Sequence, residues 1–143
     1  MSRIENLYQE KIMELAKSSI HFFELKTPSH VFTAYNPLCG DKFTFYLLAE
    51  NGKIKEASFS GFGCAISKAS SSLLVSKLID NELTNLSMLV NDFLITIDSS
   101  SRGKIPDVVY APFLAVREFP ERISCVTLGW KELENQLKQN NLS

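Results

Sequence analysis

Three cysteines and one aspartate are the residues whose types and settings in this chain are most suited to chemistry. Cys39 and Asp41 stand on either side of Gly40 in the stretch Asn-Pro-Leu-Cys-Gly-Asp, and Cys64 and Cys125 follow far along the chain. A cysteine thiolate is both a nucleophile and a metal ligand, and a carboxylate can complete a thiolate site. These four residues are therefore the candidates for a reactive or metal-binding site.

The number and spacing of the cysteines leave two interpretations open. Three is an odd number, the residues are far apart, and no pair has the Cys-x-x-Cys spacing of a local zinc motif. In a reducing compartment such thiols are more often metal ligands or reactive groups than disulfides. The alternative is that all three are buried structural thiols.

The local setting of each cysteine favours the metal-site interpretation. Cys39 lies on a loop that leads into a predicted strand, and Cys64 follows two glycines at the start of a predicted helix. At a helix start, unpaired N–H groups and the helix dipole favour a thiolate. Cys125 lies in the first turns of another predicted helix, one turn after Arg122. Together with Asp41, the three thiolates would form a tetrahedral set suited to zinc, in which the oxygen ligand suggests exchange.

The segments between residues 30 and 61 predict a three-stranded antiparallel meander. Apolar and polar residues alternate over 41–50, and Asn51-Gly52 is a strong signal for a two-residue hairpin that leads into 53–61. A shorter strand is expected over 30–35.

Helices are expected both before and after this meander in the chain. Apolar residues at helical spacing predict an amphipathic helix over 3–21, and a second helix begins near Cys64. The further predicted helices cover 84–95, 107–116 and 119–139. A polar segment with Gly and Pro over 98–107 predicts a loop insert. These elements describe an α+β fold in which a small sheet is packed by several helices.

The bulk properties fit one soluble domain over 1–143. The chain is 45% hydrophobic and 22% charged, and its net charge of −1 gives no electrostatic reason to expect nucleic acid. No stretch resembles a membrane span or a signal peptide, so we expect a cytoplasmic protein without a membrane partner.

Three stretches, "NPLCGD", "GFGCAISKASSS" and "FPERISCVTLGWKELE", together resemble the U-type iron–sulfur assembly family, which includes IscU, the N-terminal domain of NifU, and SufU. The resemblance extends over almost the whole chain. It implies an α+β fold with a small antiparallel sheet packed by helices, and with three cysteines and an aspartate clustered at one end.

Within the family, the spacing resembles SufU. Cys125 lies 61 residues after Cys64, which is longer than IscU-type chains allow, and the extra length falls at 98–107. The chain also lacks the Leu-Pro-Pro-Val-Lys-type motif and the histidine that precede the third cysteine of IscU. Arg122 matches a SufU arginine that can keep the site cationic, whereas Ser124 stands where SufU chains usually have a lysine.

The resemblance implies zinc held by Cys39, Asp41, Cys64 and Cys125, and sulfur received from a SufS-type, pyridoxal-phosphate-dependent cysteine desulfurase. In the implied mechanism a desulfurase histidine replaces one cysteine on the zinc, and the freed thiolate attacks the persulfide. The expected acceptor is Cys39, and the downstream acceptor is a Suf scaffold complex. One alternative is a scaffold that assembles an iron–sulfur cluster on the same ligands, with iron or a cluster in place of zinc. Another is a zinc-stabilised interaction module.

The remaining candidates are expected to be structural. His21 is placed in the first helix, and both it and His30 are interpreted as surface or satisfied side chains. The serines at 70–72 predict a closely packed helix face, and Trp130 and Phe119 are expected to pack near the last helix.

Overall fold

The fold comes from a computed structural model, which describes residues 3–98, 107–139 and 142. In chain order the elements are α1 (Arg3–Lys17), β1 (His30–Asn36), β2 (Asp41–Glu50), β3 (Lys53–Phe62), α2 (Ala65–Leu78), the short 3₁₀ helix η1 (Leu83–Asn85), α3 (Leu86–Ile97), the 3₁₀ helix η2 (Val108–Glu118) and α4 (Pro120–Lys138).

The three strands form the predicted antiparallel meander, in the order β1-β2-β3. Asn51 and Gly52 both have positive φ angles, of 54° and 76°, as a tight two-residue hairpin requires. At the other end of β2, Asn36 pairs with Asp41 across the turn that contains Cys39. The α+β class with a three-stranded antiparallel sheet is thus confirmed.

One face of the sheet carries the core. In β2 the side chains of Phe43, Phe45 and Leu47 are fully buried. Because side chains alternate between the two faces of a strand, Asp41 points to the same face as these three residues. In β1 the same alternation places Asn36 on the buried face. The sheet therefore presents two polar residues to the helices at the end that carries the β1–β2 turn.

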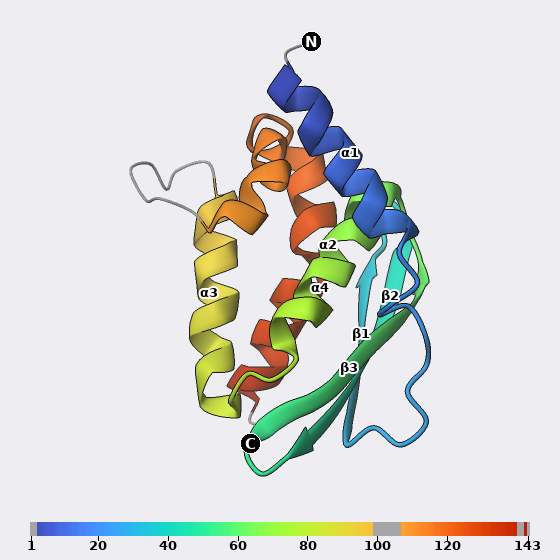
Figure 1. The fold of residues 1–143 in the computed structure, drawn as a ribbon, viewed down its shortest axis with the longest axis vertical. Helices are drawn as coiled ribbons and strands as arrows, with labels where there is room; N and C mark the ends of the chain where they lie inside the picture. The colour runs from blue at the N-terminus through green and yellow to red at the C-terminus, as the bar shows by residue number, and fades with distance from the viewer. Residues whose placement is uncertain (1–2, 99–106, 140–141, 143) are drawn as a thin grey trace.

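Helices α2 and α4 cover this face, α4 over β1 and α2 beside β3. Helices α3 and η2 pack on α4, and α1 packs on α2 (Figure 1). Gly129 lets α4 approach the sheet closely, because a Cβ there would lie 2.6 Å from Cζ of Phe45. Trp130 is fully buried and stacks on Phe93 with ring centroids 3.8 Å apart, so the expected packing role of Trp130 is confirmed.

Two helix predictions are corrected. The first helix ends at Lys17 rather than at residue 21. Beyond it, the Ser18 hydroxyl accepts a hydrogen bond from the Ile20 amide, a local side-chain bond that competes with the helical pattern. His21 therefore lies outside the helix, and its carbonyl accepts a hydrogen bond from the Phe59 amide of β3.

The segment predicted as a helix over 107–116 is an extended 3₁₀ helix, η2, with Pro112 inside it. Proline has no N–H group and clashes with the preceding turn, so a regular α-helix is disfavoured there. The ends of the other elements lie within two residues of the predicted ones or differ only by a short preceding turn.

The predicted insert, 98–107, lies outside the described residues except for Asp98 and Asp107 at its ends. Among the described helices, none combines the length and apolar character that crossing a membrane requires.

Candidate metal centre

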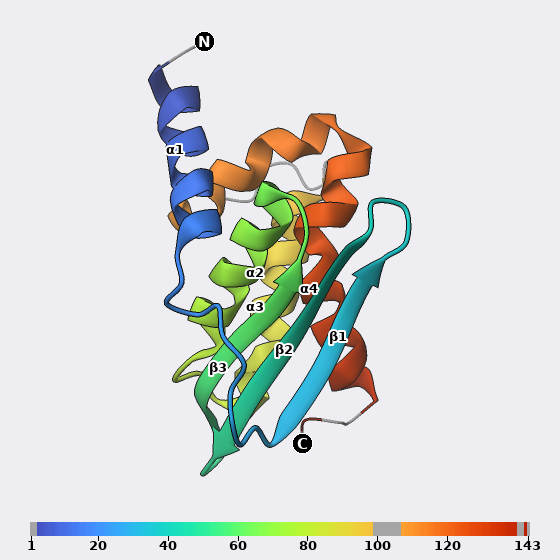
Figure 2. The ribbon, with the colours of Figure 1, turned by 90° about the vertical axis from the view of Figure 1, so that its right-hand side faces the viewer.

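The three segments that carry the cysteines meet at one end of the molecule. The β1–β2 turn, the start of α2 and the start of α4 all lie at the upper end of the view in Figure 2. We call Cys39, Asp41, Cys64 and Cys125 the cysteine cluster.

Cys39 lies in a four-residue turn over 37–40 that joins β1 to β2. The turn is closed by a hydrogen bond from the Gly40 amide to the Asn36 carbonyl, 2.8 Å, and Gly40 has a φ of +78°. The Asn36 side-chain carbonyl also accepts from the Leu38 amide, 3.1 Å, which is an Asx turn. Cys39 is therefore an exposed residue on a well-defined turn.

Asp41 joins the members of the cluster. Its side chain is only 2% exposed. Oδ2 accepts from the Cys39 thiol at 3.1 Å and lies 3.8 Å from Cys64 Sγ, while Oδ1 accepts from the Cys64 amide at 3.0 Å. Among the described residues, no salt bridge reaches this carboxylate. A buried carboxylate with neutral donors only is an arrangement that a cation would stabilise.

Cys64 is the N-cap residue of α2, as the two preceding glycines predict, and it is exposed. Its side chain makes no capping bond, so the thiol is not used to hold the helix. The carboxylate of Asp41 instead accepts from the Cys64 amide, where a helix N-terminus favours negative charge.

Cys125 is the buried member, in the second turn of α4 after Pro120. Its Sγ lies 3.7 Å from Cys39 Sγ and 3.7 Å from the Glu121 carbonyl oxygen. Burial, the hydrogen bond with Cys39 and the nearby charges of Cys64, Cys39 and Asp41 raise the pKa of the Cys125 thiol to about 12. A positive charge among these groups would relieve the repulsion.

The cluster fits a zinc ion by donor chemistry and by spacing. Three ligand atoms lie within 4.8 Å of one another, one each from Cys39, Asp41 and Cys125. Two sulfurs bonded to tetrahedral zinc at about 2.3 Å are about 3.8 Å apart, close to the Cys39–Cys125 separation of 3.7 Å. Cys64 is not in that set of three, although its Sγ lies beside Asp41 Oδ2. The structure thus assembles three of the predicted ligands and places the fourth at the edge.

Arg122 is exposed, and its guanidinium carbon lies 5.7 Å from the ring centroid of Phe119. The contacts of the described residues place its side chain on this ring rather than on the cluster. Phe119 thus lies against the first turn of α4, as expected, but at the surface, where it is 46% exposed.

The histidines lie away from these contacts. His30 Nδ1 is 3.0 Å from the Ser29 hydroxyl, and burial lowers the pKa of His21.

Sequence reasoning missed Gly63 and the pair Asn36–Ser124. A Cβ on Gly63 would lie 2.7 Å from the Phe43 ring and 2.8 Å from Asp41 Oδ1, so glycine keeps the carboxylate in place. The Asn36 amide donates to the Ser124 hydroxyl at 3.3 Å. Asn before proline is a known turn signal. Gly63 and Ser124 each stand beside a cysteine in the chain, but no sequence signal shows which residues they contact.

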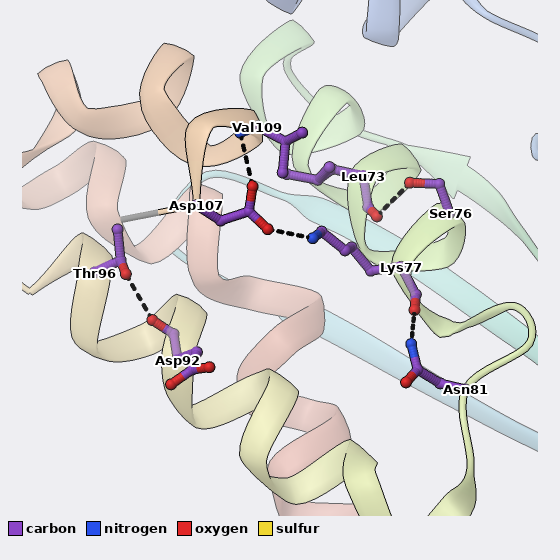
Figure 3. A network of polar contacts seen from close by, with 8 residues as sticks. All are labelled: Leu73, Ser76, Lys77, Asn81, Asp92, Thr96, Asp107 and Val109. Atoms are coloured by element: carbon purple, nitrogen blue, oxygen red, sulfur yellow. Dashed lines mark hydrogen bonds and ion pairs between the residues drawn. The ribbon is translucent and has the colours of Figure 1, made fainter. Parts of the chain in front are cut away.

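A second polar region lies at the far half of α2, in a cavity of about 380 Å³ that we call the α2–α3 pocket, lined in part by Lys77, Asn81, Asp92, Asp107 and Tyr110. Figure 3 shows the Lys77 ammonium directed at Asp107, with 2.6 Å between Nζ and Oδ2. The hydrogen bond from Lys77 lowers the pKa of Asp107, and the Val109 amide assists. Burial, with the charges of Asp107 and Asp92, raises the pKa of Tyr110 to about 12.

The buried serines of α2 are confirmed as a packing face. Ser70, Ser71 and Ser72 are each at most 3% exposed. The Ser70 hydroxyl accepts a hydrogen bond from Nε1 of Trp130 at 2.9 Å.

Comparison with known proteins agrees with this fold. A protein of Thermotoga maritima named iron–sulfur cluster assembly scaffold protein IscU is 30% identical over 135 residues, covering 93% of this chain and 94% of that protein. A protein of Bacillus subtilis named zinc-dependent sulfurtransferase SufU is 30% identical over 136 residues, covering 93% and 90%. Identity therefore does not separate the two kinds of relative.

A solved structure from Fervidobacterium islandicum, named as an iron–sulfur cluster assembly scaffold protein for the SUF system, superimposes with a TM-score of 0.74 at 30% identity. It covers 91% of this chain and 96% of that one. The family model described as the NifU-like N terminal domain matches residues 7–140. The chain belongs to this family, which includes the IscU and SufU iron–sulfur assembly proteins.

Proposed function

We propose that this protein is a zinc-dependent sulfurtransferase that accepts persulfide sulfur from a SufS-type, pyridoxal-phosphate-dependent cysteine desulfurase for iron–sulfur cluster assembly. The observation that carries the proposal is the exposed Cys39 thiol. Its Sγ and one ligand atom each of Asp41 and Cys125 lie within 4.8 Å of one another. The Bacillus subtilis relative that is named a zinc-dependent sulfurtransferase supports it.

Cys39, Asp41, Cys64 and Cys125 would hold the zinc. Bound there, zinc supplies a redox-inert positive charge that keeps the thiols deprotonated. Asp41 orients the others, because its two oxygens contact Cys39 Sγ, Cys64 Sγ and the Cys64 amide. The buried position of Cys125 shields that thiol from other electrophiles.

Cys39 is the proposed sulfur acceptor. Its Sγ attacks the terminal sulfur of the partner's cysteine persulfide, forming a new S–S bond as the partner's S–S bond breaks. The partner's cysteine leaves as a thiolate, and Cys39 becomes a persulfide, so no net oxidation occurs. Without metal, Asp41 Oδ2 accepts a hydrogen bond from the Cys39 thiol at 3.1 Å, so the carboxylate already holds this sulfur at the site.

Accessibility distinguishes Cys39 from the buried Cys125, and its place on a turn distinguishes it from Cys64, which is also exposed but begins a helix. Cys125 is 8% exposed and lies on α4, and Cys64 caps α2, whereas Cys39 lies on a turn beside Gly40. Leu38, the residue before it, is 93% exposed. A partner that covers the turn can therefore reach Cys39 with little rearrangement.

Exposed aromatic residues near the cluster support a protein partner. Phe62 is 64% exposed at the end of β3, and Phe119 is 46% exposed before α4. Large apolar side chains on a surface commonly mark an interaction site. We propose the desulfurase as the partner there, with a Suf scaffold complex as the downstream acceptor. A reducing compartment such as the cytoplasm keeps the three cysteines as free thiols.

The second candidate is a scaffold on which an iron–sulfur cluster is assembled. It is favoured by the Thermotoga maritima relative, which is named a scaffold and is as similar to this chain as the sulfurtransferase. Thiolates are also the usual ligands of iron–sulfur clusters, so iron or a cluster can occupy the same residues.

The experiment is a desulfurase assay with the purified zinc-loaded protein, cysteine and a SufS-type desulfurase. We expect faster sulfide release in the presence of reductant, and a persulfide on Cys39 by peptide mass spectrometry. In Cys39→Ala both signals should fall to those of the desulfurase alone, while the circular dichroism spectrum stays unchanged. Ser76→Ala, an exposed α2 variant, is the control and should behave as the wild type.

One outcome of these measurements would contradict the sulfurtransferase proposal. A protein that does not accelerate the desulfurase, and that instead carries a stable iron–sulfur cluster transferable to an apo-ferredoxin, would replace this proposal with the scaffold function.

A further inference from the structure

Two side-chain hydrogen bonds of the described residues join the β1–β2 turn to α4: the contact between Cys39 Sγ and Cys125 Sγ inside the cysteine cluster, and a bond between Asn36 and Ser124 beside it. Nδ2 of Asn36 donates to Oγ of Ser124 at 3.3 Å. Asn36 begins the turn that carries Cys39, and Ser124 directly precedes Cys125 in α4. The bond therefore connects the two segments whose sulfurs lie 3.7 Å apart.

Asn36 is held in place by burial, by backbone pairing and by hydrogen bonds of its side chain. Its side chain is only 7% exposed, its backbone pairs with Asp41, and its side-chain carbonyl accepts from the Leu38 amide. Because the side-chain carbonyl and amide of Asn36 are both used, a change in its amide partner is transmitted to the turn. The turn residue that follows Leu38 is Cys39.

Ser124 is the hydrogen-bond partner of Asn36 on α4. Its hydroxyl donates to the Glu121 carbonyl at 2.9 Å, which leaves its oxygen lone pairs to accept from Asn36. Ser76 in α2 makes the same kind of local bond, to the carbonyl of Leu73 at 2.7 Å (Figure 3). Ser76 thus reproduces the local helix contact of Ser124 at a position that is not joined to the turn.

We propose that Ser124, acting through Asn36, is a positioning residue that holds the Cys39 turn against α4 and sets the distance between Cys39 and Cys125. A neutral hydroxyl is suited to this role, because it accepts the amide hydrogen bond without adding charge beside the cluster. The consequence for zinc rests on the proposed function, whereas the positioning of Cys39 does not.

The test uses the metal-free full-length protein, in which alkylation of each cysteine by iodoacetamide is followed by peptide mass spectrometry. In Ser124→Ala the turn loses the Asn36–Ser124 hydrogen bond and keeps only the longer sulfur–sulfur contact with α4, so Cys39 should react about three- to tenfold faster, as expected for losing one ordinary hydrogen bond. Cys64 should react at its wild-type rate.

Ser124→Thr keeps a hydroxyl at the same position and should restore slow alkylation of Cys39. Ser76→Ala removes the equivalent local helix bond and should leave the Cys39 rate unchanged. Thermal unfolding of each variant confirms that the comparison is made between folded proteins.

The proposal is overturned if Cys39 in Ser124→Ala reacts at the wild-type rate. It is also overturned if Ser76→Ala accelerates Cys39 equally, or if Cys64 accelerates as much as Cys39, because either result would indicate general loosening.

Zinc competition with a chromophoric chelator separates this inference from the proposed function. A wild-type protein that binds no zinc would remove the proposed function, and the alkylation rates of the metal-free variants would still decide the role of Ser124. Where zinc binds, Ser124→Ala should weaken it by a factor similar to the alkylation change, and unaltered zinc affinity would contradict the positioning of a ligand.

Discussion

The cysteine cluster and the α2–α3 pocket place charged groups in opposite ways. In the pocket, the Asp107 carboxylate has its cation inside the protein, because Lys77 lies 2.6 Å from it. In the cluster, the buried Asp41 carboxylate is surrounded by thiols and an amide, and no salt bridge among the described residues reaches it. Asp107 thus has a cationic partner within the protein, whereas Asp41 has none among the described residues and would be stabilised by a bound cation.

Charge balance, rather than cavity size, distinguishes the two regions. The pocket is a hollow of about 380 Å³, yet its Asp107 carboxylate is already paired with Lys77. In the cluster, ligand atoms of Cys39, Asp41 and Cys125 instead lie within 4.8 Å of one another. Convergent donors without an internal cation indicate a metal site more directly than empty volume does.

The largest expected effect comes from removing a converging ligand. Cys125→Ser should weaken zinc binding by at least about a hundredfold, since even residues that only support ligands cost about 10–100-fold. Zinc at about 100 times its Kd stabilises a fold by about 2.7 kcal/mol, so wild-type Tm should rise on adding zinc and that of Cys125→Ser should not. Lys77→Met is the matched control in the pocket and should keep the zinc response. Equal loss in both variants would remove the contrast between the regions.

A second pair of variants separates packing from ligand placement. Gly63→Ala places a methyl group 2.8 Å from Asp41 Oδ1, and Gly129→Ala places one 2.6 Å from the Phe45 ring. Both overpack the interior and should cost about 1–3 kcal/mol in the free energy of unfolding, measured by urea titration. Only Gly63→Ala should also weaken zinc, by roughly tenfold or more, because it displaces a ligand. Wild-type zinc affinity in Gly63→Ala would show that Asp41 does not contribute to binding.

The smallest expected effect is the pH dependence of the pocket. The pKa of Asp107 is lowered from 3.8 in the folded protein, so the pair stabilises the fold above the unfolded pKa and loses this contribution as pH falls through the folded pKa. The pair is partly exposed, so Lys77→Met should cost less than about 1 kcal/mol at neutral pH. The difference from wild type should shrink as the pH falls below 3.8 through the lowered pKa of Asp107, and vanish once Asp107 is protonated. A difference that stays constant through this range would mean that Lys77 acts by packing on Tyr110, whose ring centroid is 5.2 Å away.

The fold was predictable from local patterns. Alternation over 41–50 and the Asn51-Gly52 turn define two strands and their hairpin, and both are confirmed. The end of α1 was not predictable from apolar spacing, because Ile20 continues the pattern although it is 72% exposed beyond the helix. The 3₁₀ form of η2 depends on Pro112 and on packing against α3 and α4, which a short window of sequence does not contain.

The cysteine cluster was predictable in composition and only partly in geometry. Residue types and local settings singled out the four residues, and the resemblance implied that they form one ligand set. The structure brings Cys39, Asp41 and Cys125 together while Cys64 stays at the edge. Their roles as ligands, and that of Cys39 as acceptor, stay predictions. The contacts of Gly63 and Ser124 link residues from distant parts of the chain, so they become visible only once the sheet and α4 are packed.

The most direct test of the account is native mass spectrometry of the protein purified without added metal, combined with alkylation of the cysteines before and after chelation. We expect one zinc per chain, with Cys39, Cys64 and Cys125 protected from alkylation until the chelator removes the metal. A folded, metal-free protein whose three thiols react freely would contradict it.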